Sequence, residues 1–133
     1  MSKIYYVPRH FGATWINARN ICINYGLDIA TFETLDELNA VREMCKTNLS
    51  KMKGYIYIGG MATNARSTED WYWVTTGEKI NFTMKWIEGE PNFSGPEFCL
   101  SMGRSEYLFN DIHCESYSNK FICDKTIPLE RIP

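Results

Sequence analysis

The sequence lacks several features that would assign its 133 residues to a common class of protein. It has no CxxC pair, which argues against a zinc ribbon or a thioredoxin-like motif. It has no run of about 18 apolar residues, so we expect no membrane span. Lys and Arg number 14 against 16 Asp and Glu, and without a basic excess nucleic acid is not an expected partner. The opening residues also lack the apolar stretch of a signal peptide.

The composition is otherwise that of a globular domain, with 44% hydrophobic and 14% aromatic residues. The length suits one domain over residues 1–133, with a core at about 5–124 and a C-terminal tail at 125–133 that is expected to be frayed from Thr126 onward. The five cysteines are widely and unevenly spaced, which is typical of disulfides in an oxidising compartment. We therefore expect a secreted, extracellular protein whose leader has been removed. The cysteine pairing stays open, and the odd count leaves at least one thiol over.

Two helices are predicted in the first half of the chain. The first covers 14–26, where Thr14 can cap the start and apolar residues recur at helical spacing. The second covers 34–47 and begins with a capping box in which the side chains of Thr34 and Glu37 each reach the other's backbone amide. The predicted apolar positions are Trp15, Ala18, Cys22 and Tyr25 in the first helix, and Leu35, Leu38, Val41 and Met44 in the second.

Short strands dominate the second half of the prediction, where the hydrophobic period changes after Gly54. A long segment over 85–110, rich in Gly and Pro, is predicted to be a loop, and its length suggests a functional role or an extra constraint. Helices early and strands late favour an α+β fold. The predicted strands are residues 4–7, 55–60, 71–74 and 120–123.

The segment around Pro91 gathers oxygen-bearing side chains without histidine or cysteine. Hard oxygen ligands of this kind favour Ca²⁺, held weakly at about 10⁻⁴–10⁻³ M in extracellular modules. A cis Glu90–Pro91 bond would turn the flanking side chains toward one centre. The same residue types also make up ordinary solvated loops, which is the alternative interpretation. The candidate donors are Glu90, Asn92, Glu97, Asn110 and Asp111.

Taken in order, the motifs resemble a C-type lectin-like domain over about 5–124. The resemblance implies an α+β fold with two helices, small antiparallel sheets, a long calcium-binding loop region and two disulfides, in the short form of the domain. The matching motifs are Trp15-x-x-Ala18-x-x-x-Cys22, Tyr57-Ile58-Gly59-Gly60, Trp71-x-Trp73, Trp86-x-x-x-Glu90-Pro91-Asn92, Glu97-x-Cys99, Asn110-Asp111-x-x-Cys114 and Phe121-Ile122-Cys123. The family's core strand reads Trp-Ile-Gly-Leu, so Tyr57 and Gly60 are departures from it.

The resemblance also implies the disulfides and the site. It pairs Cys22 with Cys123 and Cys99 with Cys114. It assigns one calcium to all five candidate donors, which would also bond two neighbouring sugar hydroxyls. The Glu-Pro-Asn triplet implies mannose-type sugars, namely mannose, fucose, glucose or GlcNAc, because a carboxylate accepts from a hydroxyl whereas an amide NH₂ donates to one. An auxiliary calcium site is predicted to be absent, since Phe93 and Phe98 stand where other members carry acids.

Several further residues have more than one interpretation. Phe93 can stack on the sugar face, as can Tyr107 and Phe109, although Phe109 is expected in the core along with the tryptophans. Cys45 is a buried hydrophobe, a link in a covalent dimer, or a partner of missing N-terminal sequence. His113 is a solvated loop residue or a pH sensor. Glycosylation sequons begin at Asn48, Asn81 and Asn92, and Asn48 is the preferred acceptor because a glycan at Asn92 would destroy the site.

These features predict a non-enzymatic, calcium-dependent lectin that binds mannose-type glycans on microbial or glycoprotein surfaces. A role in innate immunity is inferred by analogy with the family alone. The alternative is a protein–protein interaction module that keeps the fold without binding sugar. A small glycosidase using Glu90 and Glu97 as its carboxylate pair is disfavoured, because nothing predicts an apolar pocket that would raise the pKa of one of them.

Overall fold

The computed structural model describes residues 2–48, 54–62, 71–92, 98–103 and 105–127. These residues form two helices and eight strands, most of them short. The helices are α1 (Trp15–Asn24) and α2 (Leu35–Asn48). The strands are β1 (Ser2–Tyr6), β2 (Asp28–Ile29), β3 (Tyr55–Ala62), β4 (Trp71–Trp73), β5 (Phe98–Gly103), β6 (Leu108–His113), β7 (Lys120–Phe121) and β8 (Cys123–Ile127).

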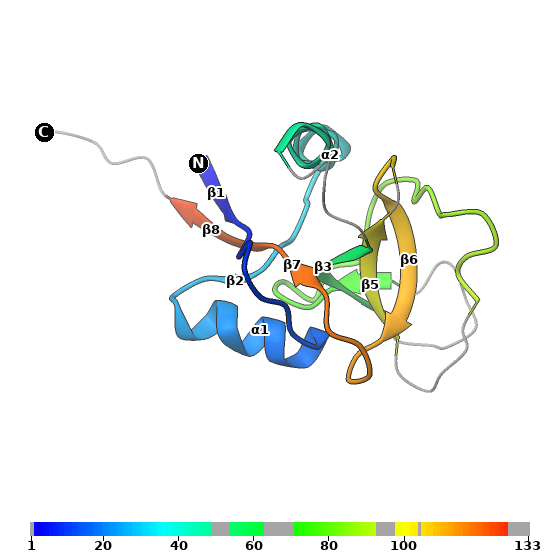
Figure 1. Ribbon diagram of the computed structural model, residues 1–133. Helices are drawn as coiled ribbons and strands as arrows, with labels where there is room; N and C mark the ends of the chain where they lie inside the picture. Colours follow the sequence, from blue (N-terminus) through cyan, green and yellow to red (C-terminus); the bar gives the residue numbers. More distant parts are fainter. Residues whose placement is uncertain (1, 49–53, 63–70, 93–97, 104, 128–133) are drawn as a thin grey trace, which may run out of the picture.

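The strands form two sheets, and α1 and α2 lie on opposite sides of them (Figure 1). The smaller sheet has the order β1-β8-β2, and the larger has the order β4-β3-β5-β6, with β7 added in parallel to β3. The predicted α+β fold with two helices and small, mainly antiparallel sheets is confirmed. The prediction of a frayed tail from Thr126 onward is wrong for residues 126 and 127, because β8 pairs with β1 as far as the Ser2–Ile127 register.

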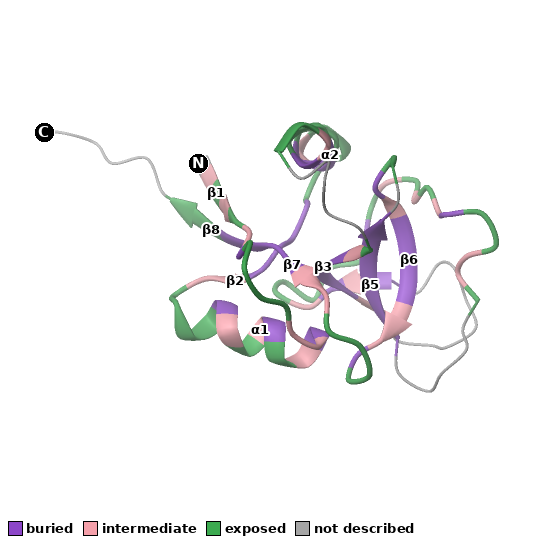
Figure 2. Ribbon diagram, in the orientation of Figure 1, coloured by how far each residue is buried: buried purple, intermediate pink, exposed green. Residues whose placement is uncertain are grey.

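The predicted loop over residues 85–110 contains two strands, so that prediction is wrong for β5 and for the first half of β6. All six residues of β5 are buried, and the strand pairs with β3 on one side and β6 on the other (Figure 2). A strand covered on both faces shows no alternation of polar and apolar residues. Without that alternation, the glycines and prolines on either side of β5 led to the prediction of a loop.

The core has two parts, one beside each helix. Trp15, Ala18 and Cys22 of α1 pack in a cluster with Tyr57 of β3 and Phe121 of β7. The Trp15 indole nitrogen donates a hydrogen bond to the Ile58 carbonyl at 2.7 Å, which fixes α1 against β3. The second cluster lies between α2 and the larger sheet. As predicted, Thr14 caps α1, accepting a hydrogen bond from the Asn17 amide at 3.3 Å.

The buried face of α2 is rotated from the predicted one. Leu35 and Met44 are 41% and 38% exposed, so they do not belong to it. Arg42 belongs to the buried face instead. Its Nε donates to the Tyr107 carbonyl at 2.9 Å, and its guanidinium lies 5.0 Å from the Phe109 ring centroid. Tyr107 is thereby buried beside α2, which excludes it as a sugar-stacking residue. The face consists of Leu38, Val41, Arg42 and Cys45.

Both disulfides have the pairing that the resemblance implies. Cys22–Cys123 joins α1 to β8, and Cys99–Cys114 joins β5 to the residue that follows β6. Cys45 is unbridged and 0% exposed. Burial raises the pKa of its thiol to about 11, which suppresses the reactive thiolate. This environment favours the interpretation of Cys45 as a small buried hydrophobe.

The glycine that departs from the family's core strand has a steric reason. The pairing of β3 with β5 shifts register between Ile58 and Met61. A Cβ on Gly60 would lie 2.5 Å from the Leu100 side chain, and one on Gly59 would lie 2.6 Å from the Ala30 carbonyl oxygen. Such distances are too short for a side chain, so the shifted strand requires glycine at both positions.

Lys3 ties β1 to the rest of the fold through a partly buried charge cluster. Its side chain is 13% exposed, and Nζ lies 2.7 Å from Glu37 and 3.7 Å from the buried Asp124. It also donates to the Thr31 carbonyl at 2.6 Å. The Glu37 carboxylate therefore pairs with Lys3 and not with the Thr34 amide. Of the predicted capping box, the hydrogen bond from the Glu37 amide to the Thr34 hydroxyl is formed, at 3.1 Å.

We predict that Lys3→Met lowers the free energy of unfolding by about 2–4 kcal/mol, because it leaves three carboxylates, those of Glu33, Glu37 and Asp124, without their cation. Burial raises the pKa of Asp124, and Lys3 opposes that rise. The folded state of the variant thus holds the Asp124 proton still more tightly than the unfolded chain does. The difference in free energy of unfolding between the wild type and the variant should be largest at pH 7 and shrink as the pH falls toward about 4.

Urea denaturation at several pH values measures this effect. Lys46→Met is the matched control. Lys46 lies on the exposed face of α2 and pairs with Glu106 at 2.9 Å, so its substitution should change stability little. If the loss of stability in Lys3→Met grew on acidification, that result would contradict the role of Lys3 as the cation that stabilises ionised carboxylates.

Candidate calcium site

A tight turn presents Glu90 at the start of the candidate site. The Glu90 amide donates to the Ile87 carbonyl at 2.9 Å, and Gly89 has a φ of 85°. That positive φ suits glycine at the third position of a type II turn. The peptide bond between Glu90 and Pro91 is cis. The local sequence therefore explains why the chain reverses direction here and places Glu90 and Asn92 close together.

Strand β6 supplies the other half of the site. Asn110 and Asp111 lie in the middle of this strand and are 7% and 6% exposed. The loop that carries Glu90 is tied to the same strand by two backbone hydrogen bonds with Phe109: its amide donates to Lys85 at 3.0 Å, and its carbonyl accepts from Ile87 at 2.9 Å. Two segments about 20 residues apart in sequence are thus held side by side.

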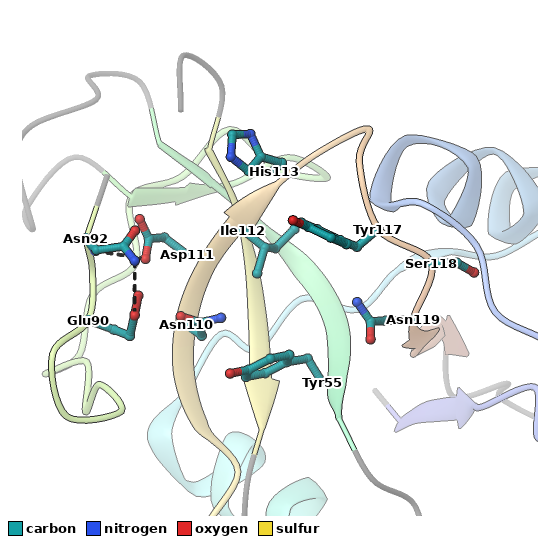
Figure 3. Close-up of a pocket in the computed structure, with 10 residues that line it drawn as sticks. All are labelled: Tyr55, Glu90, Asn92, Asn110, Asp111, Ile112, His113, Tyr117, Ser118 and Asn119. Atoms are coloured by element: carbon teal, nitrogen blue, oxygen red, sulfur yellow. Dashed lines mark hydrogen bonds between the residues drawn. The ribbon is translucent and has the colours of Figure 1, made fainter. Parts of the chain in front are cut away.

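Hydrogen bonds connect three of the predicted donors directly. The Asn92 side-chain nitrogen donates to Glu90 Oε1 at 3.2 Å, and the Asn92 backbone amide donates to Asp111 Oδ1 at 3.0 Å (Figure 3). Glu90, Asn92 and Asp111 are therefore one connected group. Asn110 lies beside them on β6. The structure brings together four of the five predicted donors, while Glu97 lies outside the residues that the structure describes.

These four side chains line one end of a cavity of about 490 Å³. They offer two carboxylates and two amides, which suit a hard cation such as Ca²⁺. Within the described part of the chain, no three His, Cys, Asp or Glu side chains converge. The oxygen set would be completed by Glu97. The four donors thus fit calcium, and none of them is a soft or nitrogen ligand that would favour zinc or copper.

Aromatic side chains pack behind the loop. Trp71 and Trp73 are buried, as predicted, whereas Trp86 is only partly buried. The Trp86 ring lies 5.4 Å from that of Trp71 and 6.0 Å from that of Phe109, between centroids. Because Phe109 precedes Asn110 directly, this stack supports the donors from the core side. Of the proposed stacking residues, Phe109 is core and Phe93 lies outside the described residues.

Phe98 begins β5 and is 4% exposed. It is one of the two residues on which the expectation of no auxiliary calcium site rests, and the other, Phe93, lies outside the described residues. His113 ends β6 and lines the same cavity as the donors. It is intermediate in exposure, and nothing about its surroundings assigns it a role.

The cavity also has lining residues that the sequence did not single out. Tyr55, Tyr117, Ser118 and Asn119 lie at the end away from Glu90 (Figure 3). Tyr55 reads as the first residue of a core strand, and the other three read as an ordinary polar turn. No spacing rule connects them with the Glu-Pro-Asn triplet. The pairing of β3 with β5, of β5 with β6 and of β7 with β3 brings them to one surface with the donors.

Comparison with known proteins identifies the family. A family model described as the lectin C-type domain matches residues 12–125. The chain belongs to the C-type lectin domain family. Domains of this family are generally binding modules and not enzymes, so the expectation of a non-enzymatic protein is supported at the level of the family.

Two relatives are similar to this chain over most of its length. Salivary C-type lectin 1 of the mosquito Aedes albopictus is 30% identical over 125 residues, covering 85% of this chain and 76% of its own length. C-type lectin domain-containing protein 180 of Caenorhabditis elegans is 25% identical over 120 residues, covering 84% of this chain. The match spans only 13% of that nematode protein, which is therefore much longer than this chain.

Solved structures agree on the fold. The carbohydrate-recognition domain of cow CD23, determined in the presence of a GlcNAc2Man3 oligosaccharide, has a TM-score of 0.73 at 21% identity, covering 97% of this chain and 92% of its own. A calcium-independent type II antifreeze protein has a TM-score of 0.71 at 23% identity, covering 94% and 87%. Identity this low establishes the fold alone, and the second example shows that the fold also serves without calcium.

Proposed function

We propose that this C-type lectin domain binds mannose-type glycans through a calcium ion. The observation that carries the proposal is the convergence of Glu90, Asn92, Asn110 and Asp111 on one end of a cavity, from a loop and a strand that are far apart in sequence. Glu97 is proposed as the fifth donor and Phe93 as a stacking residue, on the resemblance alone. We propose one calcium site and no auxiliary one.

The bound ion would supply direct coordination of two neighbouring sugar hydroxyls. The chain's own groups would orient them: a carboxylate such as Glu90 accepts from a hydroxyl, and an amide such as Asn92 donates its N–H. In the present arrangement Asn92 directs one N–H toward Glu90, at 3.2 Å. The NH₂ group carries two N–H donors, so the second can bond a sugar hydroxyl while the contacts with Glu90 and Asp111 stay.

A single shallow site of this kind would bind one sugar weakly. Useful affinity for a surface would come from repeated glycans, or from several linked domains, where effective concentration adds about 10²–10⁴ to the avidity. We propose that the protein acts outside the cell, as the two buried disulfides suggest, and that its targets are microbial or glycoprotein surfaces. No helix within the described segments is long and apolar enough to cross a membrane.

Chromatography on a mannose resin tests the proposal. We expect retention in millimolar calcium, release by EDTA, and no retention of Asn92→Ala, which loses a donor of the ion and of the sugar together. Flow-through of the folded wild type in both buffers would contradict the mannose assignment. It would favour a module that keeps the fold for another purpose, such as protein–protein binding.

A further inference from the structure

The three glycosylation sequons have different surroundings in the folded chain. Asn48 is the last residue of α2 and lines a small cavity of about 150 Å³ beside β1. Asn92 belongs to the proposed calcium site, where its side-chain nitrogen already donates to Glu90 at 3.2 Å. Asn81 lies in neither place, and its sequon alone falls wholly within the described residues.

The segment over residues 80–86 has one packed face and one exposed face. Every second side chain packs with the core cluster beside α2, and the side chains between them are exposed. The packed ones are Ile80, Phe82, Met84 and Trp86, and the exposed ones are Asn81, Thr83 and Lys85. Such alternation is typical of extended backbone, in which residues i and i+2 share a face. Asn81 and Thr83 therefore face solvent together.

The packed face holds this segment in place. The Ile80 amide donates to the Trp71 carbonyl at 3.0 Å, which ties the segment to β4. The Phe82 ring lies 6.5 Å from that of Trp73, between centroids. The residue between the two polar ones is thus turned into the core, so the exposure of Asn81 and Thr83 is a property of the fold.

Asn81 and Thr83 are the two side chains that define the sequon. The Asn amide carries the glycan, and the third residue must be Ser or Thr. Thr83 is β-branched and favours extended backbone, whereas the other two sequons have Ser at this position. Asn48, by contrast, has the helical backbone of α2. A glycan is bulky and belongs on the surface, so the extended and exposed Asn81 suits it best.

A glycan on Asn81 would also leave the calcium donors accessible. The neighbours of Asn81 in sequence, Ile80 and Phe82, line a groove of about 570 Å³ that reaches Glu90 and Pro91. Among the described lining residues, Glu90 alone borders both this groove and the calcium cavity. The glycan would therefore stand beside the groove, on the other side of the Glu90 turn from the cavity.

From this arrangement we propose that Asn81, and not Asn48 or Asn92, carries an N-linked glycan. In the transfer, the Asn81 side-chain nitrogen bonds to the anomeric carbon of an oligosaccharide held on a lipid pyrophosphate. The bond from that carbon to the pyrophosphate oxygen breaks, and one amide proton is released. The inference rests on the proposed extracellular location, which the two disulfides support, and is independent of sugar binding.

Peptide mapping of the chain secreted by human cells behind a cleavable leader tests the proposal. The three sequons fall on separate tryptic peptides, residues 47–51, 80–85 and 86–104. Release of the glycans by peptide N-glycosidase F in heavy-oxygen water converts each glycosylated Asn to labelled Asp. We expect the label on peptide 80–85 in most molecules and on neither of the others. Label on another peptide, or on none, would overturn the proposal.

Asn81→Gln should abolish the mass shift that the glycosidase causes in the intact protein, whereas Asn48→Gln, the matched control, should keep it. Both side chains are exposed, so neither substitution should disturb folding. A mass shift that persists in Asn81→Gln would overturn the assignment. If the wild type carries the label on peptide 80–85 and does not bind mannose in calcium, the proposed function fails and the glycosylation site stands.

Discussion

Glu90→Gln is expected to raise the calcium Kd by at least about tenfold, or ~1.4 kcal/mol, and to abolish retention on mannose. The reason is charge, since the affinity of an oxygen site for Ca²⁺ depends on how many carboxylates it offers. Among the described donors only Glu90 and Asp111 are charged, so the variant removes half of that negative charge. The fold should survive, because glutamine still offers an oxygen to the Asn92 amide, now 3.2 Å from Glu90.

Glu88→Gln provides the matched comparison. Glu88 stands two residues earlier in the same loop, is exposed and does not line the cavity. The change of side chain and of net charge is identical. In calorimetric titrations, Glu88→Gln should keep a calcium affinity near that of the wild type, whereas Glu90→Gln should not. Equal losses in the two variants would mean that calcium responds to the general charge of the loop, and would contradict a specific role for Glu90.

The second large effect concerns the disulfides. Replacing both cysteines of the Cys22–Cys123 bridge with alanine should lower the free energy of unfolding by about 4–5 kcal/mol, against about 3 kcal/mol for the Cys99–Cys114 bridge. The bridges close chain segments of 101 and 15 residues, and a longer closed loop restricts the unfolded chain more. All four cysteines are at most 2% exposed, so the cavities left by alanine should contribute similarly.

Urea denaturation of the two double variants measures the order of these losses. Calcium titration should give the opposite order, because Cys114 follows Asp111 by three residues whereas the other bridge joins α1 to β8. A larger loss of stability for the shorter bridge would contradict the entropic account. Calcium affinity that falls equally in both would show that the shorter bridge has no special part in holding the site.

The candidate site could be indicated from the sequence more directly than the strands around it. The proposed donors belong to compact motifs, and Glu90-Pro91-Asn92 and Asn110-Asp111 could be recognised without knowing that the second pair lies on β6. The strands could not be predicted as directly. β5 is buried on both faces, so its residues show no alternation of polar and apolar side chains. The buried face of α2 includes Arg42, whose side chain contacts the Tyr107 carbonyl and the Phe109 ring.

The end of the cavity formed by Tyr55, Tyr117 and Asn119 could not be predicted for a different reason. Tyr55 and Tyr117 are 62 residues apart, and the parallel pairing of β3 with β7 together with the Tyr57 hydrogen bond to the Tyr117 carbonyl brings them to one surface. Asn119 depends on a hydrogen bond to a tyrosine that reads as core. Local patterns identify residue types at set spacings, whereas this surface is created by sheet topology.

A calcium titration in the presence and absence of mannose tests the central claim most directly. If the ion bridges protein and sugar, each ligand must tighten the other by the same factor. With mannose about tenfold above its own Kd, the apparent calcium Kd should fall by about tenfold. A calcium Kd that is the same with and without saturating mannose would contradict the proposal that calcium and sugar share one site.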